Sequence, residues 1–101
     1  MLQKKSDAIQ DNEIQRLAAI FHALSSPLRL QILFYLLDGE HCACEFPVII
    51  TASQPNTSRH LNILRKAKLI KYRREGQKII YALTNPELIL RIKNTILEKE
   101  E

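Results

Sequence analysis

The chain of 101 residues has no tryptophan, one methionine and only two cysteines. Two cysteines are too few for the disulfide framework of a small secreted domain. The N-terminal stretch MLQKKSDAIQDNE lacks the apolar core of a signal peptide, and the longest apolar run, LQILFYLL, is too short to cross a bilayer. We therefore expect a cytoplasmic protein with reduced thiols and no membrane partner.

Catalytic motifs are also missing. The sequence has no H-E-x-x-H, no Walker loop, no G-x-S-x-G and no paired carboxylates. A chain of this size with a basic face has little room for a substrate cleft. The sequence therefore predicts a protein that is not an enzyme.

Acidic residues are scarce in one stretch of the chain. Residues 53–81 hold eight Lys or Arg against Glu75 alone, a charge of +7, whereas the rest of the chain carries −3. A concentrated basic segment suits a phosphate-bearing partner, although a solvated basic face would give the same composition.

Three helices are predicted in the first half of the chain. Apolar residues recur at spacings of three and four from residue 12 to 24, after a flexible segment at 1–11. Ser26 and Pro27 suit the N-cap and first position of a second helix, which is apolar nearly all round and therefore buried. This helix ends near Gly39, and a short third helix is expected near 45–52.

The second half predicts a polar helix, a hairpin and a last helix. Ser53 or Gln54 caps the polar helix, in which Leu61 and Leu64 face the core and the polar side chains face outward. On either side of a turn at Glu75-Gly76, apolar and polar residues alternate along the chain. This pattern predicts a β-hairpin with a basic tip. The last helix begins with Thr84 or Asn85 as cap and Pro86 at its first position.

This order of elements predicts a winged helix-turn-helix fold over residues 12–99, mainly α with a small β-hairpin wing. A helix fits the DNA major groove, where Arg, Asn and Gln read base edges, and a basic wing contacts the backbone. The predicted DNA-binding residues are Gln54, Asn56, Thr57, Ser58, Arg59, His60, Asn62, Arg65, Arg73, Arg74 and Lys78.

The first and last helices carry more apolar side chains than one small core can use. These side chains are Ile14, Leu17, Phe21, Ile89, Ile92 and Ile96. We therefore predict a homodimer that is joined through these two helices.

Three stretches, HALSSPLRLQIL, SQPNTSRHLNILRKAKLI and REGQKIIYAL, resemble in this order the ArsR/SmtB family of winged-helix transcriptional repressors. The resemblance covers roughly residues 14 to 95. It implies a homodimer that holds a palindromic double-stranded operator until a metal ion or another signal releases it. Lys68 stands where family members usually have the glycine of a left-handed helix end.

The resemblance places Cys42 and Cys44 on the Cys-x-Cys of members that respond to arsenic, cadmium or lead. It implies a sensor of As(III), Sb(III), Cd(II) or Pb(II), since thiolates favour soft ions. Two sulfurs on one ion lie within roughly 4 Å of each other, which residues i and i+2 of a regular helix cannot achieve. Pro47 is tolerated only in the first helical turn, so Cys44 should precede the third helix.

The rest of the ligand set stays open. Pro47 stands where arsenic-sensing relatives often have a third cysteine, and His41 is a candidate third ligand for Cd(II) or Zn(II). The last helix has no His or Asp, so the family's other metal site is expected to be absent. Two alternatives to ion sensing stay open for Cys42 and Cys44. The pair could form a thiol redox switch or respond to another signal, or the two residues could simply be small buried apolar side chains.

Overall fold

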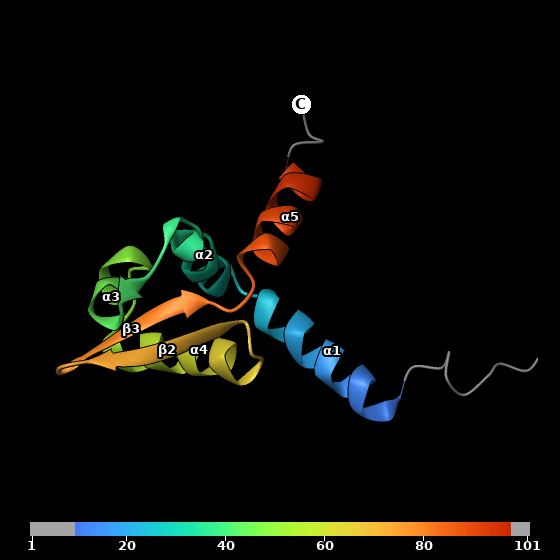
Figure 1. Ribbon diagram of the computed structural model, residues 1–101, viewed down its shortest axis with the longest axis horizontal. Coiled ribbons are helices and arrows are strands. Elements are labelled where there is room, and N and C mark those ends of the chain that lie inside the picture. Colours follow the sequence, from blue (N-terminus) through green and yellow to red (C-terminus); the bar gives the residue numbers. More distant parts are fainter. Residues whose placement is uncertain (1–9, 98–101) are drawn as a thin grey trace, which may run out of the picture.

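The computed structural model describes residues 10–97 (Figure 1). Most of the predicted flexible segment at 1–11, and the predicted domain end at residue 99, lie outside these residues. The elements are α1 (Asp11–Leu24), α2 (Pro27–Tyr35), β1 (His41–Cys42), α3 (Phe46–Ile49), α4 (Gln54–Lys66), β2 (Ile70–Glu75), β3 (Lys78–Leu83) and α5 (Pro86–Leu97). Short 3₁₀ turns at Leu36–Asp38 and Ala43–Glu45 follow α2 and precede α3.

The helix starts follow the capping side chains. The Oγ of Ser26 accepts a hydrogen bond from the Arg29 amide at 3.3 Å, and the Oγ of Ser53 accepts one from the Asn56 amide at 3.2 Å. Of the two predicted caps for α5, Asn85 accepts the amide hydrogen bond of Leu88, at 3.1 Å. The predicted starts of α2, α4 and α5 are therefore confirmed.

The core lies between α2, α3, α4 and the sheet. Ile32 and Leu33 of α2, Phe46 of α3, and Leu64 of α4 are fully buried, and Ile70 at the start of β2 closes the cluster. The prediction that the second helix is central is confirmed.

The sheet has three antiparallel strands in the order β1-β3-β2, one more than the sequence predicted. β1 pairs with β3 through Cys42 opposite Ile80. Glu75 pairs with Lys78, so the hairpin turn is Gly76-Gln77, one residue later than predicted. Gly76 has φ +64°, the left-handed conformation that such a two-residue turn requires.

Lys68 ends α4 in a left-handed conformation, with φ +64°. The amide of Leu69 donates to the Leu64 carbonyl at 3.0 Å, and the amide of Lys68 donates to the Arg65 carbonyl at 2.9 Å. This pair of bonds is the Schellman motif, which glycine usually completes. The hydroxyl of Thr84 donates to the Lys68 carbonyl at 2.7 Å and helps to hold the strained residue in place.

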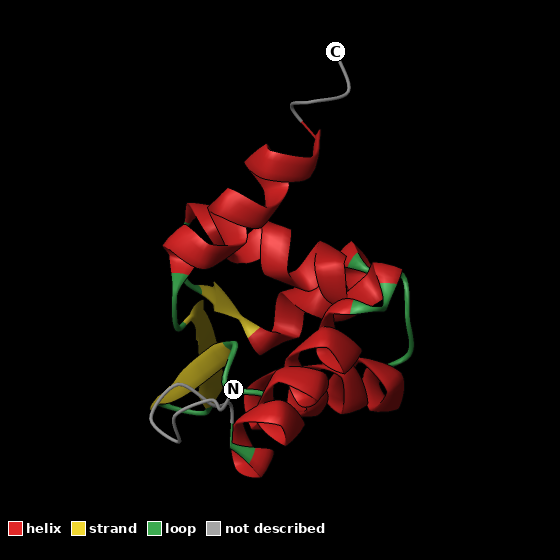
Figure 2. Cartoon of the chain, turned by 90° about the vertical axis from the view of Figure 1, so that its right-hand side faces the viewer, coloured by secondary structure: helices red, strands yellow, loops and turns green. Residues whose placement is uncertain are grey.

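α1 and α5 project away from the sheet and the other helices in Figure 1, and in the view of Figure 2, turned by 90°, the last helix again extends away from the sheet toward the C-terminus. Ile14, Leu17 and Phe21 of α1 are exposed, as are Ile96 and Leu97 of α5. One assignment to this surface is wrong: Ile89 is buried in the chain's own core, at the start of a helix that packs on the 3₁₀ turn after α2.

No single helix of residues 10–97 is long and apolar enough to cross a membrane. α1 and the segment Pro27–Asp38 are together long and apolar enough, but only by length and composition, and the chain bends by 90° between them.

Candidate nucleic-acid interface and thiol site

α4 presents a polar face to solvent. The exposed side chains that were predicted to contact DNA are Gln54, Asn56, Ser58, Arg59 and Asn62. The half-buried Arg65 donates to the Asn62 Oδ1 at 2.8 Å, and its guanidinium lies 5.9 Å from the centre of the Tyr72 ring on β2. The exposed face of α4 is thereby continuous with the wing.

The prediction that Thr57 and His60 face outward is wrong. Their side chains are 2 % and 9 % exposed. Together with Leu61 and Leu64 they follow the i, i+3, i+4, i+7 spacing of one helix face, and that face is packed on the core. Thr57 donates its hydroxyl hydrogen bond to the Ser53 carbonyl at 2.8 Å.

His60 is held by Arg29, a buried charged residue that the sequence reasoning did not single out. The Arg29 Nη1 donates to the His60 Nδ1 at 3.1 Å, its Nε donates to the Ala23 carbonyl at 2.8 Å, and its Nη2 donates to the His22 carbonyl at 3.0 Å. Because Arg has only donors, His60 accepts at Nδ1 and is neutral. Burial, together with the charges of Arg29 and Arg59, lowers the pKa of His60. Arg29 therefore ties the end of α1 to α4.

The wing carries Arg73, Arg74 and Lys78 on its exposed surface. Arg73 already has carboxylate partners: its Nη2 lies 2.9 Å from the Glu40 Oε1, its Nε lies 3.4 Å from the Glu40 Oε2, and Glu75 lies 3.7 Å away. The hydrogen bond and charge of Arg73 lower the pKa of Glu40. A DNA phosphate would have to compete with Glu40 for this guanidinium.

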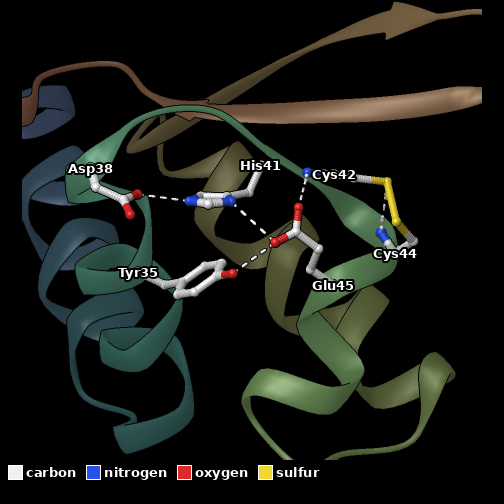
Figure 3. A network of polar contacts seen from close by, with 6 residues as sticks. All are labelled: Tyr35, Asp38, His41, Cys42, Cys44 and Glu45. Atoms are coloured by element: carbon white, nitrogen blue, oxygen red, sulfur yellow. Dashed lines mark hydrogen bonds and ion pairs between the residues drawn. A yellow bond between two sulfur atoms is a disulfide. The ribbon is translucent and has the colours of Figure 1, made fainter.

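Cys42 and Cys44 lie outside regular helix, as the geometry of two sulfurs on one ion requires. Cys42 is extended, with φ −70° and ψ 140°, and Cys44 lies in the 3₁₀ turn before α3. Pro47 occupies the first turn of α3. The two sulfurs are joined as a disulfide, with the Cα atoms 5.1 Å apart (Figure 3). The backbone thus brings both sulfurs to one place.

The His41 ring is turned to two carboxylates and not to the sulfurs, so its candidacy as a third ligand stays a prediction. Its Nε2 lies 2.7 Å from the Asp38 Oδ1 and its Nδ1 lies 3.1 Å from the Glu45 Oε1, so both ring nitrogens are engaged (Figure 3). Adjacent side chains of a strand point to opposite faces, which separates His41 from Cys42. Burial alone lowers the pKa of His41, but the two carboxylates outweigh burial and raise it.

Glu45 holds the cysteine segment from the other side. Its Oε2 accepts the amide hydrogen bond of Cys42 at 3.0 Å, and its Oε1 accepts the hydroxyl hydrogen bond of Tyr35 at 2.7 Å. The hydrogen bond from Tyr35 and that from the Cys42 amide lower the pKa of Glu45, which keeps the carboxylate charged. α2 and the cysteine turn are thereby fixed to each other.

The cysteines border a hollow of about 290 Å³ between the 3₁₀ turn, α4 and the wing. Its lining includes Cys42, Cys44, Gln54, Ser58, Lys78 and Ile79. The two sulfurs thus share one surface with side chains of α4 and the wing that the sequence predicts to contact DNA. Within residues 10–97, no group of three or more His, Cys, Asp or Glu side chains is placed to hold a metal ion.

Comparison with known proteins identifies the family. The model of the arsR family of bacterial regulatory proteins matches residues 26–72. The chain is 33 % identical to a cadmium resistance transcriptional regulatory protein CadC homolog of Staphylococcus aureus, over 96 % of this chain and 80 % of that protein. It is 38 % identical to the arsenical resistance operon repressor of Staphylococcus xylosus, over 70 % of this chain and 68 % of that protein.

The fold has a close structural neighbour. The homodimeric winged helix-turn-helix DNA-binding domain of Mb0332 from Mycobacterium bovis superposes with a TM-score of 0.82 at 24 % identity and covers 94 % of both chains. The predicted fold is therefore confirmed, including the wing. The chain belongs to the ArsR family of bacterial regulatory proteins and is a winged helix-turn-helix transcriptional regulator, not an enzyme.

Proposed function

We propose that the chain is a homodimeric repressor that binds operator DNA through α4 and the wing and is released when a thiophilic ion binds Cys42 and Cys44. The ion would be As(III), Sb(III), Cd(II) or Pb(II), because thiolates favour soft ions. The cadmium and arsenic regulators among its relatives support this class of effector.

The observation that carries the proposal is the shared hollow. Cys42 and Cys44 lie on the same lining as Gln54 and Ser58 of α4 and Lys78 of the wing. When bound, the ion supplies bonds that fix the two sulfurs relative to each other. A conformational change at the cysteine turn would therefore displace the neighbouring side chains of α4 and the wing directly, without rearrangement of the core.

The DNA-binding surface is supported by its composition and exposure. The exposed residues of α4 are amides, hydroxyls and Arg59, which are the groups that read base edges in the major groove. Arg74 and Lys78 extend the basic surface along the hairpin. The exposed apolar faces of α1 and α5 support a dimer, which would present two such surfaces to a palindromic operator.

Fluorescence anisotropy of a labelled operator tests the proposal. The reduced protein is titrated onto the operator with and without each ion, and the same titration is run for Cys42→Ser and Cys44→Ser. Each variant should bind the operator nearly as well as the parent, since serine fits a partly exposed turn before a helix. Each should resist release, because one thiolate cannot chelate. Release that persists in the double variant would contradict the proposal.

A second candidate function is control by thiol oxidation, which the Cys42–Cys44 disulfide favours. Operator binding should then differ between the oxidised and the reduced protein when ions are removed by a chelator. Equal operator affinity of the two forms, together with release of the reduced form by ions, would exclude this candidate.

A further inference from the structure

We infer that Arg29 is a positioning residue for operator binding. Its side chain fixes the orientation of α4 relative to α1, and this orientation decides which spacing between the two half-sites of an operator the protein accepts. This role rests on the proposed function, in which a dimer joined through α1 and α5 reads DNA with α4.

Arg29 closes the C-terminal end of α1. It lies in the first turn of α2 and is only 6 % exposed, and its Nε donates to the Ala23 carbonyl at 2.8 Å. Its Nη2 donates to the His22 carbonyl at 3.0 Å. Both carbonyls belong to the last turn of α1, where carbonyl groups have no partner within the helix and a cation is favourable. The end of α1 is therefore anchored to this guanidinium.

The third nitrogen of the guanidinium reaches α4. The Arg29 Nη1 donates to the His60 Nδ1 at 3.1 Å, in the interior of the protein. His60 occupies the inner face of α4, whereas its neighbours Arg59 and Asn62 are exposed on the polar face. Because successive turns of a helix are joined by backbone hydrogen bonds, a displacement of His60 also displaces these outward side chains.

The shape of the guanidinium makes these contacts a fixed junction. Its nitrogens lie in one plane and their hydrogens point in set directions, so the two carbonyls of α1 and the ring of His60 are held at set positions around it. α1 and α4 each pack on α2, and α1 then projects away from the sheet and the other helices (Figure 1). A rotation at this junction therefore swings the whole of α1 relative to α4.

In a dimer joined through α1 and α5, the junction sets the distance and the angle between the two α4 helices. Adding one base pair between two half-sites moves one of them by about 3.4 Å along the DNA and by roughly 35° around it. Two α4 helices held at a fixed distance and angle therefore fit one spacing, whereas a loose junction lets them adjust to several.

The test separates half-site spacing from half-site sequence. The palindromic operator is obtained by selection from a random DNA library with the reduced parent protein and a metal chelator. It is then resynthesised with one base pair added to or removed from its centre, and separately with one half-site base pair substituted. Fluorescence anisotropy gives the dissociation constant for each DNA. The parent should bind both altered spacings at least about tenfold more weakly than the selected operator, a loss comparable to one base contact.

Arg29→Lys keeps the charge but offers one nitrogen in place of three, so it should bind the three spacings nearly equally. It should still reject the substituted half-site as strongly as the parent does, because the outward side chains of α4 are unchanged. Arg91→Lys, the same change at an exposed position of α5, serves as the control and should keep the parent's preference for one spacing. Sedimentation and circular dichroism verify that each variant is a folded dimer.

Two changes at His60 repeat the test without altering Arg29. His60→Leu removes the acceptor of the Nη1 hydrogen bond and should accept several spacings, as Arg29→Lys does. His60→Asn supplies its Oδ1 as an acceptor and should keep the preference for one spacing. This pair of variants tests the contact even where Arg29→Lys does not fold.

The outcomes separate the role of Arg29 from the proposed function. Folded, dimeric Arg29→Lys or His60→Leu protein that keeps the parent's preference for one spacing would overturn this role. Loss of half-site discrimination together with spacing discrimination would also overturn it, since that result indicates general damage to α4. His60→Asn protein that behaves as His60→Leu would exclude the hydrogen bond as the cause. A parent protein that is monomeric, or that selects no sequence from the library, would contradict the proposed function itself.

Discussion

His60 is a buried histidine whose ring accepts a hydrogen bond from the Arg29 guanidinium, and its burial, more than this contact, lowers its pKa. The unfolded chain takes up a proton near the ordinary pKa of 6.5, whereas burial, Arg29 and Arg59 lower the pKa in the folded chain. The unfolded state therefore binds more protons as the pH falls below 6.5. The free energy of unfolding should decrease over that range.

His60→Asn tests this pH dependence, since the Asn Oδ1 can accept from Arg29 but does not titrate. Urea denaturation near pH 8 and near pH 5.5 should show that the parent loses more stability on acidification than the variant. The raised pKa of His41 has the opposite effect, but it is present in both proteins and cancels in the difference. Parallel pH profiles of the two proteins would contradict the assignment.

The two buried residues of α4 also show where the sequence was insufficient. Thr57 and His60 were assigned outward because they are polar, although their spacing relative to Leu61 and Leu64 already indicated the inner face. Arg29 stands at the first turn of an otherwise apolar helix, and this isolated charge was the available signal for its buried hydrogen bonds. Polarity predicts exposure only where no buried partner satisfies the polar group.

At the scale of elements, α4 and the wing should contribute differently to DNA binding. Asn56→Ala should relax sequence discrimination by about 1–3 kcal/mol, the value of a good bidentate base contact. Arg74→Ala should instead weaken binding to all sequences alike and make the salt dependence shallower by about one phosphate. Both variants are measured by anisotropy on operator and scrambled DNA at several salt concentrations. A wing variant that changed sequence preference while the α4 variant did not would reverse the assignment.

Arg73 should behave differently from Arg74 because Glu40 already pairs with it. Arg73→Ala should weaken DNA binding less than Arg74→Ala, since the pair with Glu40 must be broken before a phosphate is contacted. Glu40→Gln keeps the shape of the side chain and removes its charge, so it should strengthen binding to operator and scrambled DNA alike. Unchanged affinity in Glu40→Gln would show that the pair does not compete with phosphate.

Most elements were predictable because their signals are local. Cap side chains and proline mark the starts of α2, α4 and α5, and alternation with Gly76 marks the hairpin. β1 was missed because its two residues carry no pattern of their own and become a strand only by pairing with β3. That pairing also places His41 and Cys42 on opposite faces of the strand, and their adjacency in the sequence does not reveal this arrangement.

At the scale of the whole molecule, the exposed apolar faces of α1 and α5 predict a dimer. Phe21 is 63 % exposed and Ile14 is 52 % exposed, and contiguous apolar patches of this kind mark interfaces. Phe21→Glu should therefore give a monomer in sedimentation at micromolar concentration. Val48→Glu makes a comparable change at a side chain of α3 that is 79 % exposed and should leave the dimer intact. A parent protein that sediments at 11.7 kDa would contradict the prediction.

We propose that chemistry at Cys42 and Cys44 is coupled to DNA binding by α4 and the wing within one molecule. Coupling between two binding sites is reciprocal. If the ion weakens operator binding by a certain factor, the operator must weaken ion binding by the same factor. The direct measurement is a Cd²⁺ titration of the reduced protein, followed by thiolate-to-metal charge-transfer absorption, with and without saturating operator. We expect weaker ion binding in the presence of operator, by a factor equal to the loss of operator affinity in the presence of Cd²⁺. An ion affinity that is the same with and without operator would show that the two sites are not coupled.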